Sequence, residues 1–154
     1  MKKLFNRMIQ GTISDVMISG YTDAETLPVF HPMYERIYFI VNENIFELYI
    51  DDGIIRHNQL KNINEWFDIE EDDQFSLMSI YSQLFKTEQE IKVTRIDYKA
   101  IPFSTIEINY TDGENERQLF LDPNNFLVSL TIINKNRVSK SNFLAFLFIF
   151  CSIH

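Results

Sequence analysis

Short stretches in which apolar and polar residues alternate occur along most of the chain, and this period of two predicts β-strands. In residues 45–51, Phe46, Leu48 and Ile50 fall on one side of the predicted strand. Residues 37–42 are apolar at both parities, which is typical of a central strand covered on both faces. Complete or partial alternation predicts further strands at residues 91–98, 105–110, 118–122 and 126–133, and a returning strand from Ile54.

Turn residues separate these stretches. Asp52 and Gly53 stand between residues 45–51 and Ile54, which is a strong signal for a two-residue β-hairpin, because the glycine supplies the positive φ that such a turn needs. Later turns are predicted around Gly113 and Pro123. Residues 91–133 are therefore expected to form an antiparallel meander.

One longer segment has helical spacing. Its apolar residues recur at i, i+1, i+4, i+7 and i+8, which places them on one face of an α-helix. Asp72 or Asp73 can cap the N-terminus of that helix, and acidic residues there favour the positive end of the helix dipole. The pattern predicts the main helix at about residues 73–88, with a second short helix near residues 60–67. The residues on the apolar face are Leu77, Met78, Tyr81, Leu84 and Phe85.

The fold class predicted from these elements is α+β. A length of 154 residues favours one domain, residues 1–154, and is enough to bury a core. Fourteen Phe and seven Tyr favour strands, because aromatic rings pack well on pleated, half-buried surfaces. We therefore expect a single domain in which an antiparallel sheet of about six or seven strands carries one main helix on one face.

The C-terminal tail, residues 135–154, is first basic and then apolar. Residues 143–151 are all apolar, but this run is short of the roughly 20 residues that a membrane-spanning helix needs, so no membrane span is expected. The tail is interpreted as a terminal strand or helix packed into the core. The alternatives are a membrane-touching anchor, a tail altered by a frameshift, and a surface for homo-oligomer formation through Phe143, Phe146, Phe148 and Phe150.

Charge is unevenly distributed along the chain. Residues 11–134 hold all 22 acidic residues but only eight basic ones, and each end holds three basic residues. An acidic body argues against nucleic acid as a partner and favours a basic protein.

The single cysteine, Cys151, excludes an intrachain disulfide, and the N-terminus lacks the uninterrupted apolar stretch of a signal peptide. A cytoplasmic location is therefore predicted.

No motif in the chain demands a particular chemistry. Nucleophile elbows, phosphate-binding glycine loops and zinc-ligand spacings are missing, so no cofactor and no metal are predicted, and an enzyme is not favoured. Two of the many carboxylates could still meet as a general acid and base. Asp51, Asp52 and His57 could come close around the predicted hairpin as a weak metal site, but turn geometry explains the two aspartates better. Residues 112–116 lack the ligand register of an EF-hand.

The most suggestive segment is an aromatic pair followed by a dense acidic run. At an interface, aromatic rings anchor the centre and carboxylates steer the encounter with a basic partner. The chain is therefore predicted to be a non-enzymatic acidic binding protein that docks on a basic protein, as inhibitors and toxin-immunity proteins do. In the alternative, the rings pack inward and the acids keep the surface soluble. The predicted partner-binding residues are Trp66, Phe67, Asp68, Glu70, Glu71, Asp72 and Asp73.

Two other functions stay open at this level. The aromatic sheet face could wall a small-ligand or enzymatic pocket, with His57, Arg95, Tyr98 and Glu107 as lining residues. A self-associating structural protein could instead use the apolar tail, residues 143–151.

Overall fold

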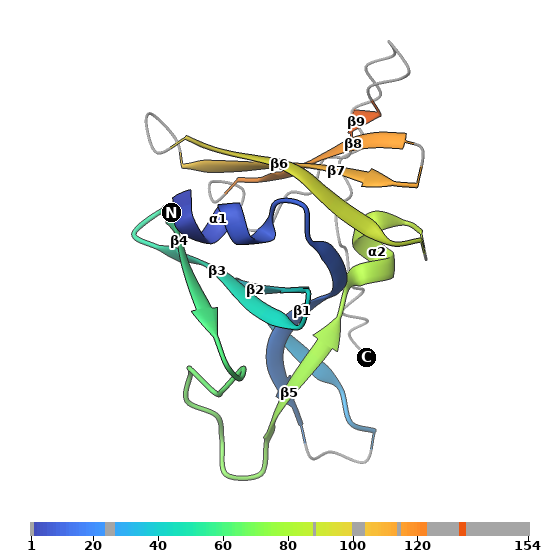
Figure 1. The fold of residues 1–154 in the computed structure, drawn as a ribbon. Coiled ribbons are helices and arrows are strands. Elements are labelled where there is room, and N and C mark those ends of the chain that lie inside the picture. The colour runs from blue at the N-terminus through green and yellow to red at the C-terminus, as the bar shows by residue number, and fades with distance from the viewer. Residues whose placement is uncertain are drawn as a thin grey trace.

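The computed structural model describes residues 2–23, 27–87, 89–99, 104–113, 115–122 and 133–134. In these residues, two short helices accompany a set of antiparallel strands (Figure 1). The helices are α1 (Lys2–Met8) and α2 (Tyr81–Phe85). The strands are β1 (Thr12–Thr22), β2 (Phe30–Val41), β3 (Asn44–Asp51), β4 (Ile54–Leu60), β5 (Gln74–Ser79), β6 (Ile91–Lys99), β7 (Thr105–Asp112), β8 (Asn115–Leu121) and β9 (Ile133–Asn134).

All of these strands belong to one sheet, in the order β4-β3-β2-β1-β6-β7-β8-β9, with β5 paired to β1 off that path. β2 covers one edge of β1, whereas β5 and β6 share the other edge. Only Thr12 and Ile13 join β1 to β6. This short junction lets the sheet turn, and Figure 1 shows β6, β7 and β8 on one side of α1 with β2 and β3 on the other.

The sheet therefore has two parts, β1–β5 and β6–β9, and helix α1 fills the space between them (Figure 1). Phe5 and Met8 lie three residues apart on one helix face, and both are buried in the core. Gly11, just after the helix, has no room for a side chain, because a Cβ atom there would overlap the Val41 side chain. The buried residues around the helix come from both parts of the sheet and include Val16, Ile37, Phe39, Phe46, Leu48, Val93, Ile108 and Tyr110.

Most of the predicted strands are confirmed. Asp52 and Gly53 form the predicted hairpin turn between β3 and β4, with φ values of 50° and 70°. Ile37, Tyr38 and Phe39 are all buried, as expected for a central strand covered on both faces. The predicted strands at residues 37–42, 45–51, 91–98, 105–110 and 118–122 fall on β2, β3, β6, β7 and β8. The strand predicted at residues 126–133 lies, apart from Ile133, outside the described residues.

The predicted fold class, α+β with one main helix at about residues 73–88 on a sheet face, is wrong. The described chain is mostly β, and residues 74–79 of that segment are strand β5. Helix α2 covers only five residues and ends at Lys86, which adopts a left-handed conformation with φ of 52°. The strand prevails because β5 pairs with β1 at six consecutive positions, and this pairing outweighs the local helical spacing.

The second short helix predicted near residues 60–67 is also wrong, because this segment is the end of β4 followed by a loop. Helix α1 and strand β1, which the structure places at the centre of the fold, were not predicted from the sequence. The tail, residues 135–154, and the proposed oligomer contacts in it lie outside the described residues. None of the described helices has the length and apolar character needed to cross a bilayer.

Candidate functional site

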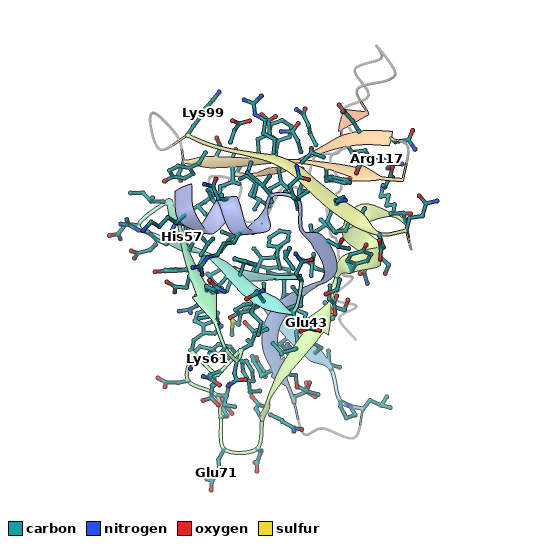
Figure 2. All side chains as sticks on the ribbon, in the orientation of Figure 1. Glu43, His57, Lys61, Glu71, Lys99 and Arg117 are labelled. Atoms are coloured by element: carbon teal, nitrogen blue, oxygen red, sulfur yellow. The ribbon has the colours of Figure 1, made fainter. Side chains whose placement is uncertain are left out.

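The predicted partner-binding residues lie on one loop, residues 61–73, which connects β4 to β5 and is called the acidic loop below. It holds six carboxylates and one lysine. Figure 2 shows Glu71 at its tip, pointing away from the body of the molecule. Asp68, Glu70, Glu71 and Asp72 are exposed, and Asp73 is half-buried. The run of acids predicted from sequence is therefore presented together to solvent.

Trp66 fixes the base of the acidic loop to the sheet. Its indole Nε1 donates a hydrogen bond to Ser19 Oγ on β1 at 2.8 Å, and Ser19 is fully buried. The Arg36 guanidinium on β2 lies 4.1 Å from the centre of the Trp66 ring, which is a cation–π contact. One ring thus contacts two neighbouring strands, so the loop is held in one position.

Arg36 also neutralises a buried carboxylate beneath Trp66. Glu47 on β3 is only 1% exposed, and its Oε1 lies 2.7 Å from Arg36 Nη1. Its other oxygen accepts a hydrogen bond from Asn58 Nδ2 at 2.8 Å. Both carboxylate oxygens are therefore paired, which a buried charge requires.

Tyr38 completes this polar cluster. It lies directly opposite Glu47 in the β2–β3 register and contacts Ser19 through its hydroxyl. Burial raises the pKa of the Tyr38 hydroxyl above its usual 10.0. We call Ser19, Arg36, Tyr38, Glu47, Asn58 and Trp66 the anchor cluster.

Phe67 extends the contact of the loop with the sheet. Its ring stacks edge-on against Trp66 at 5.0 Å and lies 5.9 Å from the Phe75 ring on β5. At the other end of the acidic run, Asp73 N donates to Glu70 O at 3.1 Å and closes a turn. The two aromatic residues of the predicted site are thus half-buried at the base of the loop, while its acids form the tip.

The acids of the loop lack ion-pair partners among the described residues. Four arginines pair elsewhere: Arg36 with Glu47, Arg56 with Asp51, Arg95 with Asp97 and Arg117 with Asp112. These four arginines are therefore used elsewhere, and no ion pair among the described residues neutralises a carboxylate of the acidic loop.

Exposed apolar side chains lie at the same end of the molecule. Leu27 is 80% exposed and Val29 is 52% exposed, both in the loop between β1 and β2. In the sheet, Thr22 lies between Phe30 of β2 and Gln74 of β5, so this loop and the acidic loop leave the sheet side by side.

Asp23 and His31 hold the base of the β1–β2 loop. The Asp23 carboxylate accepts a hydrogen bond from Val29 N at 3.0 Å and lies 2.8 Å from His31 Nε2. The His31 ring in turn stacks on Tyr21 at 4.7 Å. These contacts tie the end of β1 to the start of β2 at the base of that loop.

The structure brings only two of the four proposed pocket residues near each other. Arg95 and Glu107 lie on the neighbouring strands β6 and β7, where Glu107 interacts electrostatically with the exposed Arg95. Tyr98 of β6 packs against the core. His57 is on β4, where its ring packs edge-on against Phe5. Helix α1 lies between strands β6–β8 and strands β2–β3 and contributes Phe5 and Met8 to the core there (Figure 1). A small cleft, partly open to solvent, is lined instead by Tyr34, Glu35, Ile37, Leu48, Tyr49, Ile50, Ile55, Leu121 and Asp122.

The weak metal hypothesis gains no support from the geometry. Asp51 pairs with Arg56, and the described residues contain no group of three metal-ligating side chains. Sequence reasoning also missed most of the anchor cluster, because Ser19, Arg36 and Glu47 come from three strands and carry no shared motif.

Comparisons of the chain with protein-family models, with curated proteins and with solved structures found no match.

Proposed function

We propose that the chain is a non-enzymatic binding protein of the cytoplasm, which docks on a basic protein through the acidic loop. The observation that carries this proposal is a set of exposed carboxylates at the loop tip, without ion-pair partners in the described part of the chain, above a base fixed by Trp66. A loop that is ordered before binding loses less conformational entropy in the complex.

Each part of this surface has a distinct role. Glu70, Glu71 and Asp72 attract a basic surface over a distance of about one Debye length, roughly 8 Å at physiological salt. Leu27 and Val29 beside them supply apolar area that becomes buried in the complex. Trp66 and Phe67 support the loop from beneath. Inhibitors that neutralise basic toxins or nucleases require a surface of this kind.

The test is titration of the full chain against a panel of purified basic nucleases and hydrolases. We expect a dissociation constant that rises about tenfold or more between about 50 mM and about 500 mM salt, because salt screens the carboxylates. The triple variant Glu70→Gln, Glu71→Gln, Asp72→Asn should weaken binding to a similar extent.

The matched control removes the same number of exposed charges elsewhere, in the variant Glu43→Gln, Asp52→Asn, Glu90→Gln. It should bind within about threefold of the natural chain. Equal losses in the two triple variants would point to a non-specific effect of net charge. Absence of salt-dependent binding across the panel would contradict the proposal.

A further inference from the structure

One row of backbone groups on β5 is unpaired within the described part of the chain. Ile80 N donates to Val16 O at 2.7 Å, which makes these two residues a hydrogen-bonded pair at the end of the β1–β5 ladder. In an antiparallel ladder, such pairs alternate with pairs whose backbone groups point away from each other. The groups that face β1 belong to Gln74, Ser76 and Met78, and those that face away belong to Phe75, Leu77 and Ser79.

Pro32 gives an independent check of this register. It lies opposite Gly20 on the β2 side of β1 and has no backbone N–H. The Gly20 backbone groups are therefore expected to face β5, where Gly20 pairs with Ser76. The backbone N–H groups of Phe75, Leu77 and Ser79 are called the outward amides below. β1 is the one described strand that pairs with β5, so these amides have no strand partner there.

Strand β4, which ends the sheet on one side, differs from β5 in ways that discourage strand addition. β4 carries Arg56, and its outward-facing Ile55 N–H is taken by Ser104 Oγ at 2.9 Å. Natural proteins protect edge strands with charges, prolines, bulges or covering contacts of this kind. β5 contains no charged residue and no proline, its pairing with β1 shows no bulge, and Leu77 is 42% exposed.

The charge beside β5 indicates what would add to this edge. The acidic loop runs directly into Gln74, the first residue of β5. At the other end of the strand, Ser79 Oγ donates to the Asp15 carboxylate at 2.6 Å. A strand that pairs with β5 therefore meets negative charge at both ends. A second copy of this chain carries a net charge of −8 and would be repelled, whereas a basic segment would be attracted.

We propose that β5 is a docking edge, to which the basic partner adds an extended segment as a further antiparallel or parallel β-strand. This inference rests on the proposed function for the sign of the charge of the partner. Backbone hydrogen bonds to the outward amides hold the added strand. Alternate side chains of that strand pack on Leu77, and its lysines or arginines face the carboxylates of the acidic loop.

The first experiment measures amide hydrogen exchange in the free full-length chain by NMR. The outward amides should exchange at least tenfold faster than the amides of Ser76 and Met78, which donate to β1. Slow exchange of the outward amides would overturn the inference, because the edge would already be covered by this chain or by a second copy. The molecular mass in solution then distinguishes these two occupants.

The second experiment adds a probe, a synthetic eight-residue peptide of alternating lysine and valine. We expect the exchange of the outward amides to slow at least tenfold at saturating peptide. A peptide of alternating glutamate and valine should leave it unchanged. Peptide binding that shifts the acidic loop but leaves the outward amides unprotected overturns the docking edge while the proposed function stands. If the lysine peptide shows no salt-dependent binding, both the docking edge and the proposed function are overturned.

The variant Leu77→Pro removes one outward N–H and leaves the β1 ladder intact, since proline is tolerated where the N–H faces away from the neighbouring strand. It should lower the affinity for the lysine peptide about tenfold with little change in melting temperature. Leu77→Thr keeps the N–H and separates the role of the backbone from that of the side chain. Unchanged affinity in a folded Leu77→Pro variant contradicts the inference.

Discussion

The residues of the anchor cluster are joined by an ion pair, a hydrogen bond and a cation–π contact. Glu47 is buried on a sheet strand, and Arg36 pairs with it beneath Trp66. A buried ion pair adds little net stability compared with apolar residues, but removing one partner leaves an uncompensated charge. The arrangement therefore fixes the position of the acidic loop more than it stabilises the fold as a whole.

Replacement of Arg36 tests this view directly. Arg36→Ala leaves Glu47 buried without a cation and is expected to lower the free energy of unfolding by about 3–5 kcal/mol. The double variant Arg36→Met, Glu47→Leu should recover most of that loss, because no buried charge remains. Urea unfolding curves measure both values. Arg56→Ala, which breaks an exposed pair with Asp51, serves as the control and should cost less than about 1 kcal/mol. Equal costs for the two single variants would contradict this account.

Tyr110 is a single residue that makes the free energy of unfolding depend on pH. It is fully buried, its hydroxyl has no hydrogen-bond partner among the described residues, and burial raises its pKa well above the usual 10.0. The unfolded chain therefore loses this proton at lower pH than the folded chain does. The contribution to stability is complete below about pH 10 and is lost as the pH rises further.

The variant Tyr110→Phe removes the unpaired hydroxyl and is expected to raise the free energy of unfolding by about 1 kcal/mol at pH 7, with a larger gain near pH 11. Tyr38→Phe is the matched control, because the Tyr38 hydroxyl contacts Ser19 and its loss should destabilise the fold. Chemical denaturation at the two pH values measures these differences. Destabilisation by Tyr110→Phe at pH 7 would indicate that its hydroxyl has a partner.

At the scale of elements, the segment of β5 and α2 shows what the sequence could and could not predict. Alternating strands with clear turns, such as β3 and β7, were found because each pattern is local. Residues 74–85 fit helical spacing, yet the first half pairs with β1, a strand more than fifty residues earlier in the chain. The acidic residues of the candidate site could be predicted because they follow one another in the sequence. Ser19, Arg36 and Glu47 could not be predicted as part of the site, because only long-range strand pairing brings them beneath Trp66.

The order of the acidic loop is expected to depend on Trp66. Trp66→Ala removes the hydrogen bond to Ser19 and the contact with Arg36, so the loop is released from the sheet. Cleavage after Glu70 or Glu71 by a glutamate-specific protease should accelerate at least about tenfold, since local opening controls cleavage of a folded protein. The control Leu27→Ala changes an exposed side chain in the neighbouring loop and should leave the cleavage rate unchanged. If Trp66→Ala is cleaved at the natural rate, the ring does not order the loop.

At the scale of the whole molecule, α1 joins the two parts of the sheet, because only two residues connect β1 directly to β6. Phe5→Ala leaves a cavity between the two parts and should lower the free energy of unfolding by about 3–5 kcal/mol. Trp66 fluorescence reports on the β1–β4 part, and amide exchange of β7 reports on the other. Both should lose stability by the same amount, since one core serves both parts. Lys3→Ala, on the exposed face of the same helix, is the control. Destabilisation of one part alone would show that the two parts of the sheet unfold independently.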